Sequence, residues 1–393
     1  MRASTILRKV FTQGDVIGHR NRREALLKAT EALAMGASLT VTCLGRDLSS
    51  DAREKHRIKS VDELLRNRHL HAEREAIYRE LAHRVLHSVT RLLVQVDWSD
   101  TGRRDVRVLR AAIALPGRSF VLWEQVYSEQ EYNKDSTHRE FMHEVHRIIP
   151  TWCEQVVVVT DAGYRAPWFR LIESFGWHWI GRIRNNGTCL GAVTDDEWVK
   201  TRELYARAGN KPQDLGLVQL NKSAPLDAHL FLSSKPKPKR RGLRRNAEHY
   251  RAAKSHREPW LLATSVTLSC TVKQALALYD TRMQIEQSFR DLKSHRFAHG
   301  LRYSHSKKPN RVAILLLISA LVTFAQWLAG LVADAQDWAR AFQANTERKR
   351  RTLSVVFVGA RVLRTSRFKL TDELIQQALQ NLSALVIQHH LAA

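Results

Sequence analysis

Cysteine is scarce in this chain, which holds four among 393 residues. No two of them form a C-x-x-C pair, so the spacing argues against a zinc ribbon and against a disulfide framework. Few and unpaired thiols are typical of a reducing compartment, and we expect a cytoplasmic protein. The opening residues 1–15 also lack the apolar stretch of a secretory signal.

Acidic residues are also few. Lys and Arg total 63 against 39 Asp and Glu, which gives a net charge of +24. The excess is spread along the chain rather than confined to a tail. A folded protein with this balance most often binds a polyanion, usually nucleic acid. Charge alone leaves open a ribosome-associated or merely basic protein.

Long apolar runs are absent except for one, residues 313–333. That run is long enough to cross a bilayer and contains one strongly polar residue, Gln326. A membrane span is one interpretation. No second run exists and the rest of the chain is polar, so we expect a helix buried on all sides within a large domain.

The N-terminal residues 1–90 are basic and predicted to be helical. Residues 23–35 have helical spacing and Gly36 follows, 38–48 suit a short helix, and Asp51 with Glu54 imitates a capping box opening a helix over 51–67. This layout is typical of a helix-turn-helix DNA reader, and an ordinary helical subdomain is equally open. The candidate DNA contacts lie in the first half of the third helix: Arg53, Lys55, Arg57 and Lys59.

From residue 91 the apolar period changes from helical to strand-like. Three consecutive strands are followed by helix, strand, helix and strand, which predicts an α/β fold with a ribonuclease-H-like mixed sheet and helices on its faces. The strands are predicted at 91–100, 106–115, 118–127, 154–163 and 178–184, and the helices at 138–150 and 167–177.

The remaining sequence predicts a β-rich insertion and then a helical region. Short strands are expected at 215–220, 228–234 and 259–266, around a very basic stretch at 235–259. Helices are expected at 272–295, 310–333, 334–344, 348–364 and 371–391. The predicted division is a helical DNA-binding domain (1–90), a catalytic core in two parts (91–186 and 266–333), the insertion (187–265) and a helical C-terminal region (334–393).

Two aspartates stand at the ends of predicted strands, Asp97 and Asp161. A buried strand fixes the position of a side chain at its end. With Glu286 from a later helix they form a set of three carboxylates, which suits two Mg²⁺ or Mn²⁺ ions. A single aspartate after a strand is more often a turn or cap residue, and we interpret Asp100 and Asp280 in that way.

The pattern Y-x2-R-x3-E-x6-K joins Tyr279, Arg282, Glu286 and Lys293. On one continuous helix, at about 100° per residue, the four side chains would share one face. A carboxylate on that face can hold a cation, and its basic neighbours can hold phosphates. An ordinary amphipathic surface is the alternative, but the two strand-end aspartates and the net charge favour metal-dependent chemistry on a nucleic-acid backbone.

Three blocks carry a resemblance to a known family: LVQVDWSD, VVTDAGY and YDTRMQIEQSFRDLK. The chain resembles the bacterial insertion-sequence, cut-and-paste DDE transposases that the Y-x2-R-x3-E-x6-K signature defines. Within that family it is most similar to the transposases of composite tetracycline-resistance transposons. The segments LGRDL, RNRHLHAER and FQANTERKR extend the resemblance over nearly the whole chain.

The resemblance implies that Asp97, Asp161 and Glu286 are a catalytic triad that binds two Mg²⁺ ions, for which Mn²⁺ can substitute. It implies that Tyr279 and Arg282 hold the DNA backbone beside a flipped base and that Lys293 holds a terminal phosphate. Trp260 matches the insertion-domain tryptophan on which that base stacks. Packing within a strand is the alternative for Trp260.

The implied reaction begins with binding of transposon terminal inverted repeats. Cleavage of one strand, formation and opening of a DNA hairpin, and strand transfer into target DNA follow, within a homodimer that the C-terminal helices could join. The expected location is the bacterial cytoplasm, at the nucleoid. The alternatives are a ribonuclease-H-like metal nuclease without strand transfer and a transposase-derived DNA-binding regulator without activity.

Overall fold

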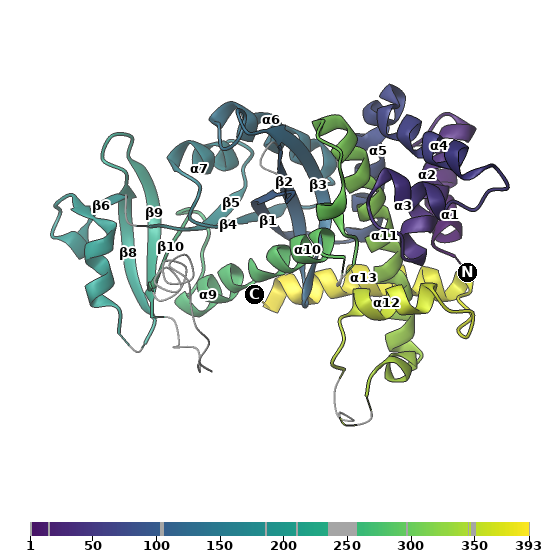
Figure 1. Ribbon diagram of the computed structural model, residues 1–393. Helices are drawn as coiled ribbons and strands as arrows, with labels where there is room; N and C mark the ends of the chain where they lie inside the picture. The colour runs from purple at the N-terminus through teal and green to yellow at the C-terminus, as the bar shows by residue number, and fades with distance from the viewer. Residues whose placement is uncertain are drawn as a thin grey trace, which may run out of the picture. The chain divides into compact units, whose positions relative to one another are not determined.

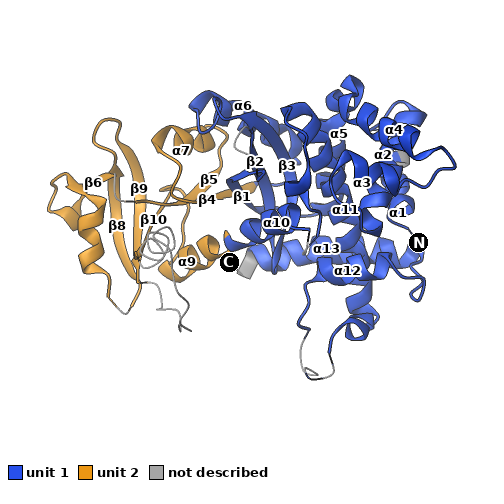
Figure 2. Cartoon of the chain, in the orientation of Figure 1, with its two compact units in different colours: residues 1–154, 283–392 blue, residues 155–282, 393 orange. Residues whose placement is uncertain are grey.

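The computed structural model consists of two compact units, formed by Met1–Glu154 with Met283–Ala392 (unit 1) and by Gln155–Arg282 (unit 2) (Figure 1, Figure 2). The structure describes residues 2–14, 16–102, 106–184, 187–209, 211–234, 258–295, 298–344, 346 and 351–392. The division of the chain into five sequence regions stays a prediction.

Unit 1 begins with five helices. They are α1 (Ala3–Gly14), α2 (Arg20–Met35), α3 (Val41–Arg46), α4 (Glu54–Arg66) and α5 (Arg68–Val85). Gly36 ends α2 as predicted, with a φ of 123° that favours glycine. The capping box at Asp51 is wrong. Helix α4 starts at Glu54 with Arg53 as its N-cap, so Asp51 lies too far before the helix to cap it, and the Ser50 hydroxyl accepts the Ala52 amide at 3.3 Å.

The sheet of unit 1 confirms the three predicted strands. Strands β1 (Arg91–Asp100), β2 (Val106–Leu115) and β3 (Arg118–Ser128) pair antiparallel in the order β3-β2-β1. Their side chains are largely buried, because helices pack against them: α5, α6 (Asp135–Ile148), α10 (Met283–Lys293), α11 (Pro309–Ala335) and α13 (Asp372–Ala392). A buried ion pair, in which Arg110 donates to Glu124 at 2.6 and 2.8 Å, ties β2 to β3.

Helix α11 (Pro309–Ala335) is the core of unit 1. The most apolar part of this helix is 94% buried inside the protein, which confirms the expected central helix. It contacts α2, α4, β3, α12 (Val355–Leu363) and α13 (Asp372–Ala392). The predicted helix at 334–344 is only the short 3₁₀ turn η4 (Trp338–Phe342), and α12 begins later than predicted.

The C-terminal helix α13 is fixed to the sheet by His390. One ring nitrogen accepts the Leu93 amide of β1 at 3.1 Å, and the other lies 2.8 Å from the Ala114 carbonyl oxygen of β2. The ring is fully buried. This histidine could not be singled out from the sequence, because its partners are main-chain groups far away in the chain.

Unit 2 is a seven-stranded mixed sheet. Its parallel pair β4 (Gln155–Thr160) and β5 (His178–Arg182) is linked by α7 (Ala166–Glu173), as predicted. The insertion strands extend this sheet, because β10 (Trp260–Thr264) pairs directly with β5. The order continues through β9 (Leu226–Ser233), β8 (Gln213–Leu220), β6 (Thr188–Gly191) and β7 (Val199–Lys200). Most of the basic stretch 235–259 lies outside the described residues.

The single helix expected over 272–295 is wrong. Helix α9 (Val272–Asp280) ends before α10 begins at Met283, and residues 281 and 282 form a turn. The Thr281 hydroxyl donates to the Leu278 carbonyl at 2.6 Å, a local bond that competes with continued helix. Tyr279 therefore precedes the break, Arg282 lies within it, and Glu286 and Lys293 follow it. The argument that all four share one helical face does not hold.

We predict that Gly359→Ala strongly destabilises the protein. Helix α12 crosses α11 at Gly359, where an added Cβ would overlap the Gln326 carbonyl oxygen of the α11 backbone. Overpacking of this kind costs about 1–3 kcal/mol or more. Urea unfolding should show a lower midpoint. Gly18→Ala is the matched control, because nothing lies near a Cβ there, and an equal loss in both variants would contradict the close packing.

We also predict that stability falls on acidification from pH 7 to pH 5. Burial lowers the pKa of His299 to about 3 and that of His390 to about 4, below the usual value near 6.5. As the pH falls below 6.5 the unfolded chain binds these protons first, so each histidine weakens the folded state by up to about 1.4 kcal/mol per pH unit.

Urea unfolding at several pH values measures this dependence. His390→Gln should reduce the slope of unfolding free energy against pH by an amount that corresponds to up to about one bound proton. The variant is itself expected to be less stable. An unchanged slope in that variant would show that His390 is not a buried neutral group.

Candidate active site

Asp97 and Glu286 line the same cavity in unit 1. This cavity has a volume of about 340 Å³ and is lined by Asp97, Trp98, Ser99, Glu286, Phe289, Arg290, Lys293, Ser294 and Arg302. Strand β1 is buried from residue 92 to 96 and becomes half-buried at Asp97. Asp97 accepts the Trp98 amide at 2.9 Å, which fixes one carboxylate oxygen. Glu286 stands in the first turn of α10.

Basic side chains surround this cavity. Lys293 donates to the Ser99 hydroxyl at 3.1 Å and to Asp100 at 3.3 Å. Asp100 also accepts the Gly102 amide at 2.7 Å, which confirms it as a turn residue. Burial acts to raise the pKa of Asp100, but the Gly102 amide and the charges of Lys293 and Arg302 outweigh it and lower the pKa. Phosphates entering the cavity would meet this positive rim.

Asp161 belongs to unit 2 and follows β4 as predicted. The Tyr279 hydroxyl donates to Asp161 at 2.8 Å, and Arg282 lies 3.7 Å from its other oxygen. Burial acts to raise the pKa of Asp161. The Arg282 charge, the Tyr279 hydroxyl, the Ala162 amide and Arg184 together outweigh it and lower the pKa. Asp161 is therefore ionised at neutral pH, as a metal ligand must be.

Tyr279 is itself a buried residue, with 2% of its surface exposed. Trp260 packs edge-on against it with 5.0 Å between ring centroids, and Trp260 is only half-buried. Tyr279 therefore holds the Asp161 side chain, and Trp260 packs against Tyr279. Their predicted contacts with a DNA backbone and a flipped base stay predictions, as does that of Arg282.

The predicted contacts on α4 lie on a different part of unit 1. Arg53, Lys55 and Lys59 are exposed, and Lys59 lies 3.8 Å from Glu63. Arg57 is half-buried and donates to the Leu48 carbonyl at 3.0 Å. Their role in DNA binding stays a prediction, and Arg57 also has a structural role within the turn before α4.

Several residues of the candidate site were not identified from the sequence. Arg290 could have been found, because it lies one helical turn after Glu286. Arg302 could not, because it reaches the cavity from the 3₁₀ turn η3 (Leu301–Tyr303), sixteen residues beyond Glu286 and outside any helical pattern. Arg184 acts on Asp161 from two residues beyond the end of β5, which only the tertiary structure reveals.

The three carboxylates have the chemistry of a magnesium site, since hard cations prefer oxygen ligands. Asp97 and Glu286 share a cavity, and Asp161 is kept ionised in the other unit. Among the residues that the structure describes, no three His, Cys, Asp or Glu side chains gather around one point that could hold a metal ion.

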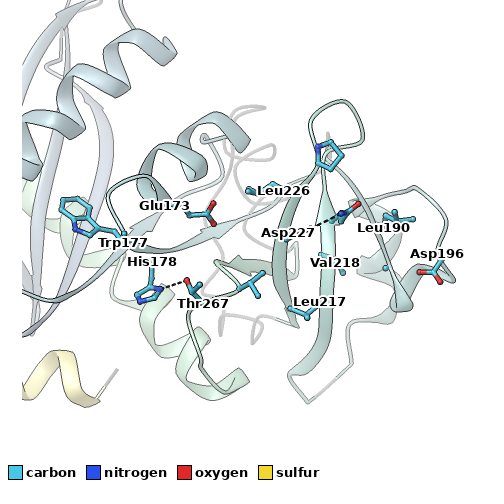
Figure 3. Close-up of a pocket in the computed structure, with 15 residues that line it drawn as sticks. Glu173, Trp177, His178, Leu190, Asp196, Leu217, Val218, Leu226, Asp227 and Thr267 are labelled. Atoms are coloured by element: carbon cyan, nitrogen blue, oxygen red, sulfur yellow. Dashed lines mark hydrogen bonds between the residues drawn. The ribbon is translucent and has the colours of Figure 1, made fainter.

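A larger cavity in unit 2 is separate from these residues (Figure 3). Its volume is about 980 Å³, and Asp161, Tyr279 and Arg282 are not among its lining residues. Its apolar wall includes the exposed Leu217 and Val266. His178 and Thr267 form a 3.0 Å hydrogen bond at one side, as Figure 3 shows. Size alone therefore does not locate the candidate active site.

Similarity to known proteins is found for one family model and for solved structures. No curated protein sequence matches the chain. A cryo-EM structure of the piggyBac transposase synaptic complex with hairpin DNA is similar at 11% identity and a TM-score of 0.38, over 89% of this chain and 62% of that chain. This chain thus spans less than two thirds of that protein. The family model described as "Transposase DDE domain" matches residues 87–323, which is more than half of the sequence. The chain belongs to the family of transposases with a DDE domain.

Proposed function

We propose that this protein is a cut-and-paste DNA transposase that binds transposon terminal inverted repeats. The single observation that carries the proposal is the cavity shared by Asp97 and Glu286, with Arg290, Lys293 and Arg302 around it. Carboxylates for cations beside basic groups for phosphates suit phosphoryl transfer on DNA. Membership of the DDE transposase family supports the same reaction.

Asp97, Asp161 and Glu286 would hold two Mg²⁺ ions, with Mn²⁺ as a substitute. When bound, such ions activate an attacking oxygen and stabilise the leaving oxygen of an in-line displacement. The chain's own residues prepare this arrangement. Tyr279 and Arg282 orient Asp161 and lower its pKa. The basic rim of the unit 1 cavity attracts the DNA backbone and positions a phosphate.

Later steps depend on DNA that changes shape. We infer nicking at the transposon end, formation of a hairpin by the freed 3′-OH, reopening of the hairpin and strand transfer to target DNA. A half-buried Trp260 beside Tyr279 suits stacking of a base displaced by the tight hairpin. A homodimer that joins two ends, a location at the bacterial nucleoid and a relationship to composite tetracycline-resistance elements are parts of this proposal.

We predict that Asp161→Asn binds the terminal repeat nearly as well as the wild type but loses cleavage. The assay uses a labelled duplex with the inverted repeat that flanks the coding sequence, in Mg²⁺ or EDTA, on a denaturing gel. Loss of a group that only supports a metal ligand already costs about 10–100-fold, so loss of a ligating carboxylate should cost at least about 100-fold. The same loss is expected for Asp97→Asn and Glu286→Gln.

Asp280→Asn is the matched control, since Asp280 is exposed at the end of α9. Unchanged cleavage by Asp161→Asn would remove this residue from the catalytic set. Wild-type binding without cleavage in either metal would favour the inactive regulator. Cleavage without any joined product would favour the nuclease.

We predict that Trp260→Ala slows hairpin formation more than it slows the first nick. Stacking contributes about 1–3 kcal/mol per base, which corresponds to about 5- to 150-fold in the rate of the step that needs it. Time courses of nicked and hairpin products measure both rates. Trp260→Phe keeps a ring and should lose less. Equal slowing of both steps would assign Trp260 to the packing around Tyr279 alone.

A further inference from the structure

The proposed reaction leaves unused a second cavity in unit 1, with a volume of about 1030 Å³. It is formed by the start of α3, the end of α4, the start of α5 and residues 305–311, which lead into α11. Its volume lies at the upper limit of the range of about 300–1,000 Å³ that is typical of small-molecule pockets. The cavity is therefore large enough for part of a polymer.

The lining of this cavity is strongly basic. Five of its side chains are positive, Arg66, Arg68, Lys307, Lys308 and Arg311, and one is negative, Asp62. Asp62 already accepts Arg311 at 2.6 Å and pairs with Arg66 at 2.8 Å. The exposed Arg68, Lys307 and Lys308 thus face the cavity with no further carboxylate among the lining residues.

Two other features favour an anionic occupant. Lys308 is the N-cap of α11, a helix of 27 residues, so the positive end of the helix dipole adds to the basic side chains. His71 also lines the cavity, and burial, followed by the charge of Arg74, acts to lower its pKa. Its Nε2 atom lies 3.4 Å from the Leu65 carbonyl oxygen, and a neutral imidazole there does not add to the repulsion among the five cations.

We propose that this cavity binds the sugar–phosphate backbone of duplex DNA without reading its sequence. The inference rests on the proposed transposase function and adds a second DNA contact to it. Flexible lysines act as point charges for phosphates, and such contacts position a protein on the duplex. The site uses the second half of α4, whereas the sequence argument placed the DNA contacts in the first half, where Lys59 is paired with Glu63.

The test measures binding of the full chain to a labelled duplex by fluorescence anisotropy over a series of NaCl concentrations. Each phosphate contact adds about 0.9 to the slope of log Kd against log salt. We expect Lys307→Ala with Lys308→Ala to lower that slope by up to about 2 and to weaken binding to all sequences equally. Arginine at both positions keeps the charge and should keep the slope.

Lys28→Ala with Lys369→Ala is the matched control, because both lysines are exposed in unit 1 and neither lines the cavity. It removes the same net charge and should leave the slope nearly unchanged. An equal thermal midpoint in all variants verifies folding. The proposal is overturned if the Lys307 and Lys308 alanine variant keeps the wild-type slope, or if the control loses as much.

Failure of this inference is distinguishable from failure of the proposed function. The Lys307 and Lys308 alanine variant should still cleave terminal-repeat DNA at saturating protein concentration, whereas Asp161→Asn should bind and not cleave. If Lys55→Ala with Lys59→Ala lowers the slope and the cavity variant does not, DNA follows the first half of α4. A wild-type chain that binds no DNA would overturn both proposals.

Discussion

Burial of α11 on every side is the constraint on which unit 1 depends. An apolar helix of 27 residues has no solvated face, so each neighbour must present apolar or small residues to it. Helix α12 meets this requirement with backbone-to-backbone contact at Gly330 and Gly359. The N-terminal helices α2 and α4 and the strand β3 pack on the same helix. The basic N-terminal region and the strand sheet are thereby parts of one core.

The core of unit 1 fixes the positions of the two carboxylates in its candidate active site. Strand β1 is held between β2 and the helices, so Asp97 emerges at a fixed point where burial ends. Helix α10 packs on all three strands and presents Glu286 to the same cavity. The basic groups come from less regular positions, such as Lys293 at the end of α10 and Arg302 in a 3₁₀ turn. Rigid elements hold the carboxylates, and later segments supply the charge that receives phosphate.

The period of apolar residues correctly predicted the strands that are defined by neighbouring residues in the sequence. The runs that became β1, β2 and β3 have nearly the predicted ends, because each is apolar and bounded by turn residues. The helix break at residues 281 and 282 could not be predicted, because Thr281 is compatible with a helix until its hydroxyl bonds to Leu278. Arg302 reaches its cavity, and His390 reaches β1, across long separations in the sequence. Such contacts produce no periodic pattern from which they could be predicted.

The break also changes the meaning of the Y-x2-R-x3-E-x6-K pattern. If the four residues shared one helical face, they would form a single surface for DNA. Instead, Tyr279 and Arg282 act on Asp161 within unit 2, while Glu286 and Lys293 line the cavity of Asp97 within unit 1. The unit boundary falls between Arg282 and Met283. The pattern therefore spans the unit boundary, with its first two residues in unit 2 and its last two in unit 1.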